Sequence, residues 1–300
     1  MSPHDTDLRE LRQTLRALAR RVEALEQVSD VVRRVGELPA LPRVANHILA
    51  LIADPDTTAA ELEKAIALDQ ALAAKILELA NSPFYGGLRD VGSVGEAIVR
   101  LGFMTIRNWT LATAARSAFL DAEAEPALLT TWQQSILSAM TSQTVAEQLR
   151  HASPQSIFVG GLMQGVGQLA LSHVSPAAFR EVLRISTETR VPPQLVEQER
   201  FGFDHGALGA LLIREWNFSD ELEHGVRMHH HLGEAGSAQR MAAMIALGEE
   251  IAACSGGAPG EESAVWEMSE ASRLLEVGEA GYVGLLERAR RWRVDPLLFA

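Results

Sequence analysis

The sequence predicts an all-α protein. Alanine and leucine dominate, runs of β-branched residues are scarce, and the apolar–polar alternation of half-buried strands is absent. Apolar residues recur at helical spacing instead, with proline or glycine between the periodic segments. The longest nearly uncharged run, residues 157–171, is expected to be the central helix of a helical domain.

Composition limits the classes of protein to consider. The chain has 300 residues, of which 47% are hydrophobic and 22% charged, which suits one large domain or two modest ones. The formal net charge of −12 argues against a nucleic-acid-binding surface. The single cysteine, Cys254, excludes an internal disulfide and fits a reducing compartment. No secretory signal precedes the first helix, so we predict a cytoplasmic protein without membrane insertion.

Residues 1–29 carry a short heptad repeat. Its apolar positions are Leu8, Leu11, Leu15, Leu18, Val22 and Leu25. Alternate spacings of three and four residues predict an amphipathic helix. Two interpretations stay open: the helix lies on its own domain, or it forms a short coiled coil that makes a homodimer or docks a partner.

Residues 30–120 predict several short helices. Pro39 and Pro42 begin the first. The expected capping residues of the following helices are Thr58, Asp69 and Ser93. Gly102 is expected to separate two helices, and the glycine- and proline-rich segment 82–92 is expected to be a loop.

That loop begins with aromatic and small polar side chains. They are Asn81, Ser82, Phe84 and Tyr85. A packed connection and a protein-binding surface remain equally open for these residues. If this half of the chain binds a partner, the loop is the first candidate.

An acidic linker, residues 121–126, precedes a second helical half at 126–255. One long helix is expected at 128–149, and Ser153-Pro154 begins the central helix. Further starts are expected at Ser175, Asp204 and Ser219, the last helix reaching His229, His230 and His231. Residues 256–300 form a helical extension without a recognisable motif. Trp109, Trp132 and Trp216 lie on apolar helical faces and are expected in the core.

The central run contains Gly160, Gly161, Gly165 and Gly167. Each glycine inside a helix costs roughly 1 kcal/mol relative to alanine. Another backbone is therefore expected to pack closely against this helix. The run has no phosphate-loop pattern and follows no strand, so packing is preferred to a phosphate cradle.

Several segments together resemble the HDOD domain, a divergent relative of the HD-type metal-dependent phosphohydrolases. In the first half they are LPALP at 38–42, residues 54–82, and SVGEAIVRLGFMTIRN at 93–108. In the second half they are residues 158–171, FGFDHGALGALLIREWNF at 201–218, and HHH at 229–231. The resemblance covers roughly residues 30–255. It implies an all-helical bacterial signalling module that is usually credited with no catalytic activity.

The chain departs from the catalytic relatives at their metal site. The resemblance implies that Gln164-Gly165 stands where an active HD enzyme has His-Asp, whose Asp bridges two metal ions. It also implies that Gln134 replaces an upstream histidine and that Glu249 replaces a late aspartate. Glycine offers no ligand atom, and a glutamine amide is a poor substitute for imidazole. Without the bridging carboxylate nothing holds two ions together, so we predict no catalytic residue, no metal and no cofactor.

His205, His229 and His230 remain at positions that, in the active relatives, ligate metal or contact phosphate. For His229–His231 the structural interpretation is that they cap carbonyls near a helix C-terminus. His205 is expected to be a buried, hydrogen-bonded histidine. A single residual metal site and a ligand pocket remain as alternatives.

Three functions follow, in order of preference. The first is a non-catalytic signalling protein that binds a protein partner, either a regulator or a cyclic-dinucleotide enzyme. The second is a sensor that keeps a nucleotide or cyclic dinucleotide in the degenerate pocket. The third is a residual phosphohydrolase with one metal at His205, His229 or His230.

Overall fold

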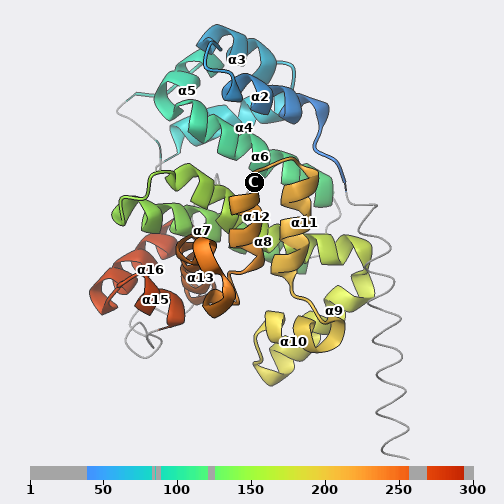
Figure 1. Cartoon of the computed structure of the whole chain (residues 1–300). Helices are drawn as coiled ribbons and strands as arrows, with labels where there is room; N and C mark the ends of the chain where they lie inside the picture. The colour runs from blue at the N-terminus through green and yellow to red at the C-terminus, as the bar shows by residue number, and fades with distance from the viewer. Residues whose placement is uncertain (1–38, 83–84, 86–88, 121–125, 257–268, 294–300) are drawn as a thin grey trace, which may run out of the picture. The chain divides into compact units, whose positions relative to one another are not determined.

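The computed structural model describes residues 39–82, 85, 89–120, 126–256 and 269–293 (Figure 1). Every regular element among these residues is a helix, which confirms the predicted all-α class. The chain divides into two compact units. The described part of the smaller unit is Ala170–His205, and the larger unit comprises Pro39–Leu169 and Gly206–Ala300. The heptad positions Leu8, Leu11, Leu15, Leu18, Val22 and Leu25 lie outside the described residues, so the N-terminal helix stays a prediction.

The larger unit begins with short helices whose starts agree with the sequence prediction. They are α2 (Arg43–Ala53), α3 (Ala59–Ile66), α4 (Gln70–Asn81), α5 (Val94–Leu101) and α6 (Phe103–Phe119). The side chains of Thr58, Asp69 and Ser93 each accept a hydrogen bond from a backbone N–H in the first turn. Such caps stabilise a helix by about 1 kcal/mol each. Gly102 has a φ of 77°, a left-handed conformation that suits glycine, and it ends α5 and begins α6.

The second part of the larger unit is built on α7 (Pro126–Gln148), α8 (Pro154–Val174) and α13 (Gln239–Cys254). Small residues let these helices approach one another (Figure 1). A Cβ at Gly161 would lie 2.8 Å from the Ser138 carbonyl oxygen of α7, and one at Gly248 of α13 would lie 2.8 Å from the same oxygen. A Cβ at Gly165 would lie 2.8 Å from the Cβ of Ser135. The predicted close approach of backbones to the central helix is confirmed.

We call this set of contacts the small-residue seam. Its members are Ser135, Ser138, Ser142, Gly161, Gly165 and Gly248. Real Cβ atoms do not approach other atoms so closely, so any larger residue at these glycines would force the helices apart. The packing that the glycines permit offsets their cost of roughly 1 kcal/mol each in a helix.

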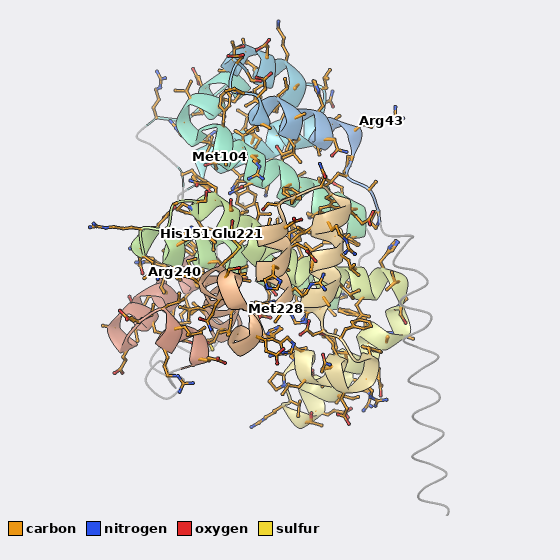
Figure 2. All side chains as sticks on the ribbon, in the orientation of Figure 1. Arg43, Met104, His151, Glu221, Met228 and Arg240 are labelled. Atoms are coloured by element: carbon orange, nitrogen blue, oxygen red, sulfur yellow. The ribbon has the colours of Figure 1, made fainter. Side chains whose placement is uncertain are left out.

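The remaining helices of the larger unit are α11 (His205–Glu215, whose first residue belongs to the smaller unit), α12 (Asp220–Arg227), α15 (Glu270–Leu274) and α16 (Glu279–Arg293). In the C-terminal extension α15 packs on α13, and α16 packs on α7 and α13. The prediction that the helix after Ser219 reaches the three histidines is wrong. Met228, labelled in Figure 2, has φ −102° and ψ 6°, so α12 ends at Arg227 and the histidines lie in the following turn.

The core contains the tryptophans, as predicted. Trp109, Trp132 and Trp216 are buried. The Trp109 ring lies 5.9 Å from the Phe158 ring of α8, and the Trp216 indole donates a hydrogen bond to the Pro39 carbonyl at 3.1 Å. These contacts join the first and second parts of the larger unit.

In the smaller unit, the last residues of α8 are followed by α9 (Pro176–Thr189) and α10 (Pro193–Phe201). Both later helices begin with proline, which suits the first turn because that position needs no N–H donor. The two helices pack together, and Glu181 of α9 lies 3.4 Å from the Arg200 guanidinium of α10.

By length and composition α8 is able to cross a membrane, and among the described helices it alone passes that test. However, 89% of its most apolar 18-residue window is buried inside the fold. Such burial is typical of the core helix of a soluble protein.

Candidate functional site

Three side chains with metal-ligand chemistry converge in the larger unit. We call His229, His230 and Glu249 the histidine–glutamate group. The turn after α12 supplies both histidines, and α13 supplies the glutamate. The possible ligand atoms of the group all lie within 4.8 Å of one another.

His229 is held from two sides. Its Nδ1 lies 2.6 Å from the Val226 carbonyl oxygen. Because a carbonyl oxygen only accepts, Nδ1 must carry the proton and donate. In the neutral ring the lone pair is then on Nε2, which lies 3.4 Å from the Glu249 carboxylate. The ring is thereby oriented with its basic nitrogen toward the acid.

Gly206 of α11 allows this arrangement. A Cβ at Gly206 would lie 2.8 Å from Cε1 of His229 and 2.9 Å from the Val226 carbonyl oxygen. Any other residue would push α11 away from the His229 ring. Our sequence analysis missed Gly206, although a glycine inside a helical segment, as in DHGALG, is a usable signal of close packing.

His230 and Glu249 are more accessible than His229. The His230 ring lies 3.8 Å from the His229 ring, centroid to centroid, and its Nε2 lies 3.6 Å from Glu249. The Glu249 side chain is 26% exposed, so the group is in reach of solvent through its carboxylate. The distances from the two histidine Nε2 atoms to the Glu249 carboxylate, 3.4 and 3.6 Å, are longer than a good hydrogen bond. At these distances the carboxylate attracts a protonated histidine electrostatically.

The group fits a single divalent ion. Nitrogen and oxygen ligands lie about 2.0–2.2 Å from zinc, so two ligands on one tetrahedral ion are on the order of 3.3 Å apart. The separations of 3.4 and 3.6 Å are close to this value. Two imidazoles and one carboxylate are also a donor set that zinc and related metals accept.

His205 belongs to the smaller unit and is bonded to Glu197 there. Its backbone N–H and its ring Nδ1 each lie 2.7 Å from the same Glu197 carboxylate oxygen. Both residues are buried. The prediction of a buried, hydrogen-bonded histidine is confirmed, whereas Glu197 is a partner that our sequence analysis missed.

The other positions inferred from the resemblance lie on α7 and α8. Gln164 is buried, and its amide donates a 3.3 Å hydrogen bond to the Gly161 carbonyl of its own helix. Gly165 packs on Ser135, and Gln134 is the neighbour of Ser135 on α7. The Ser135 hydroxyl donates to the Thr131 carbonyl at 2.8 Å. Gly165 therefore belongs to the packed seam, and the Gln164 side chain is bonded within its own helix.

The loop candidates for partner binding are partly described. The Asn81 side chain bonds both the backbone N–H and the carbonyl of Val91, at 2.8 and 2.9 Å. Ser82 is buried and donates to Leu79, and the Tyr85 hydroxyl accepts from Trp109 at 3.1 Å. Burial raises the pKa of Tyr85 to about 12. Phe84 lies outside the described residues, so the partner-binding role of the loop stays a prediction.

The sequence model of the HDOD domain matches residues 38–232. The chain belongs to the HDOD family. No curated protein matches this HDOD chain. The family assignment confirms the resemblance inferred from the sequence.

Solved structures agree with the HDOD assignment. A "Putative phosphohydrolase" from Shewanella amazonensis is 26% identical with a TM-score of 0.72, over 90% of this chain and 96% of that one. An HDOD domain protein with unknown function from Geobacter sulfurreducens is 21% identical with a TM-score of 0.71, over 91% and 98%. A "Putative signal transduction protein" from Marinobacter aquaeolei is 21% identical with a TM-score of 0.69, over 91% of this chain and 64% of that one. At 21% identity the last two share the fold alone.

Proposed function

We propose that this HDOD protein is a non-catalytic signalling protein of the bacterial cytoplasm that acts by binding a protein partner. Its family membership and the fold that it shares with a protein named for signal transduction support this proposal. The partner class that we propose is a regulator or a cyclic-dinucleotide enzyme. Self-association through residues 1–29 is part of the same proposal.

The packing of Gly165 is the observation that carries the non-catalytic part. A two-metal hydrolase needs a carboxylate between its ions, and the resemblance puts that carboxylate at position 165. A side chain there would meet Ser135, with its Cβ 2.8 Å from the Cβ and 3.2 Å from the Cα of that serine. The position therefore lacks a ligand and also lacks the space for one.

The surface near the 82–92 loop supports a partner-binding role. Arg100 of α5 donates to the Ala80 carbonyl at 2.9 Å, which ties α5 to the end of α4 where the loop begins. The preceding residue, Val99, is 81% exposed, a large apolar side chain left in solvent. A pull-down with the full chain should retain a partner that Val99→Lys loses. Leu129→Lys, at a less exposed position on α7, should keep that partner, and loss from both variants or from neither would contradict this surface.

A turnover assay tests the non-catalytic part. The pure protein should hydrolyse neither bis(4-nitrophenyl) phosphate nor a cyclic dinucleotide above the buffer rate, with or without added Mn²⁺. His229→Ala serves as the matched blank. Turnover by the natural protein that His229→Ala abolishes would overturn the proposal.

The histidine–glutamate group favours a second candidate, a phosphohydrolase that uses one metal. Its donors fit one ion, and the Shewanella protein of similar fold is named a phosphohydrolase. When bound, a divalent ion would supply Lewis acidity and activate water. His229, His230 and Glu249 would hold it, with Val226 fixing the ring of His229. Elemental analysis of the purified protein distinguishes the signalling protein from the phosphohydrolase. Less than a tenth of an equivalent of bound metal would exclude the phosphohydrolase.

A further inference from the structure

The outer face of α16, red in Figure 1, carries a basic surface of the larger unit. The helix packs on α7 and α13, and its buried side chains lie on one face, at Tyr282, Leu285, Leu286 and Ala289. On the opposite face Arg288 and Arg291 are exposed to solvent. Residues three apart are neighbours on a helix surface, so these two guanidinium groups are able to act together.

Interactions within the described part of the chain do not account for both arginines. Among these residues no ion pair involves Arg288 or Arg291, although Glu287 lies one turn before Arg291. Basic side chains stabilise a helix C-terminus through the helix dipole, but this effect falls off within the last turn. Since α16 ends at Arg293, the dipole accounts for Arg291 and not for Arg288.

Gly284 lies one turn before Arg288 on the same face of α16. A Cβ at Gly284 would meet nothing within 4 Å, so no described residue covers the helix at this point. Glycine weakens a helix relative to alanine, and in the small-residue seam close packing offsets that cost. At Gly284 the described residues provide no such packing, and the missing side chain leaves room for the backbone of a partner.

The charge of this surface is opposite to that of the chain. Residues 288–292 contain three arginines and no acid, whereas the chain as a whole has a net charge of −12. A nucleic acid would be repelled by that net charge, whereas a short acidic segment of a protein meets only the local positive charge. Trp292, half-buried at the same end of α16, adds a second residue type that interface hot spots favour alongside arginine. The HDOD match ends at residue 232, so α16 lies outside the matched region.

We propose that the surface formed by Gly284, Arg288 and Arg291 docks an acidic α-helix of a partner protein. The arginines pair with carboxylates along one side of that helix, because the fork of N–H donors matches the two oxygens of a carboxylate. Carboxylates one turn apart on a helix recur at about the spacing of the two arginines on α16. This surface is separate from the one at Val99. The proposal can fail while the proposed function holds, because its assay uses a defined peptide instead of the natural partner.

Fluorescence anisotropy with the full chain tests the proposal. The probe is a labelled alanine-based helical peptide with glutamate at every fourth position, and its neutral match has glutamine at those positions. The glutamate peptide should bind saturably and at least about tenfold more tightly than the glutamine peptide, and added salt should weaken it. Equal affinities, no saturable binding of the glutamate peptide, or tighter binding of single-stranded DNA would overturn the proposal.

Three variants localise the binding. Arg288→Glu combined with Arg291→Glu should weaken the glutamate peptide about tenfold or more, because two attractions become repulsions. Gly284→Gln should weaken it about fivefold by holding the peptide away from α16, without lowering the unfolding temperature, because glutamine is the better helix former. Arg43→Glu combined with Arg214→Glu, at exposed positions of α2 and α11, changes the net charge equally and should bind as the natural protein does. An equal loss in this control, or unchanged binding in either α16 variant, would refute the surface.

Discussion

The small-residue seam and the histidine–glutamate group have opposite chemistry, although the resemblance to HD enzymes assigns positions in both to one ancestral metal site. In the seam, Gly165 and Ser135 are packed so closely that no side chain fits between them. In the group, His229, His230 and Glu249 keep ligand atoms near one another and partly open to solvent. The small-residue seam serves helix packing, whereas the histidine–glutamate group has the residues of a binding site.

Gly165→Asp is the strongest way to break this comparison. The new carboxylate would be forced against Ser135 and buried without a partner, so we expect the free energy of unfolding to fall by about 4 kcal/mol or more. Urea denaturation measures the change. Gly233→Asp is the control, because a Cβ at Gly233 meets nothing within 4 Å. A stable Gly165→Asp protein that binds two equivalents of Mn²⁺ would show that α7 and α8 can move apart to admit a side chain at this position.

A smaller loss of stability is expected at Glu197, which bonds His205 in the smaller unit. Glu197→Ala would leave His205 buried without the acceptor for its N–H and its ring. We expect a loss of about 2–3 kcal/mol in urea denaturation. Glu199→Ala, an exposed glutamate of the same helix, should change stability by less than about 0.5 kcal/mol. Equal effects from the two variants would show that Glu197 does not stabilise the fold through His205.

His229 of the group and His231, which lies outside it, should differ in their effect on stability. His229→Ala removes the donor to the Val226 carbonyl and buried packing against Gly206, with an expected cost of about 1–2 kcal/mol. His231 is exposed, so His231→Ala should cost less than about 0.5 kcal/mol. Thermal unfolding compares them, and an effect of His231→Ala as large as that of His229→Ala would contradict the geometry.

The smallest expected effect is on the pH dependence, at Glu250 beside the group. Burial, with a smaller contribution from Glu249, raises the pKa of Glu250 above its ordinary value of 4.5. A raised pKa means that the folded state binds the proton more tightly, so this contribution to stability is present below pH 4.5 and is lost as the pH rises through the folded-state pKa. Glu250→Gln should therefore unfold at a slightly higher temperature than the natural protein at pH 7, with no gain at pH 4. A gain at pH 4 that disappears at pH 7 would reverse the sign and refute the assignment.

Local features of this fold could be predicted from the sequence, and non-local ones could not. Thr58, Asp69, Ser93 and Ser219 cap helices as predicted, because a capping bond joins residues three apart in the chain. The end of α12 was misplaced because the sequence has no proline or glycine between Arg227 and His231 to mark it.

The contacts that define the candidate site join distant residues. Asp204 was expected to start α11, and α11 does begin at the next residue, His205. The bond from the His205 N–H to Glu197, across the left-handed turn at Gly202, had no signal in the sequence. The packing of Gly206 on His229 joins α11 to the turn after α12, and no local pattern encodes it. The resemblance to HDOD proteins indicated Glu249 as a site position. Its partial burial and its distances to His229 and His230 could be seen only in the structure.

The contact between Gly165 and Ser135 has an evolutionary consequence. A single mutation that restored an acid at position 165 would meet Ser135 and be purged for instability before any catalysis could be selected. Placing an acid at this position needs at least a second, simultaneous change on α7. If the chain has the non-catalytic function proposed above, the close packing of α7 and α8 makes the loss of the acid difficult to reverse.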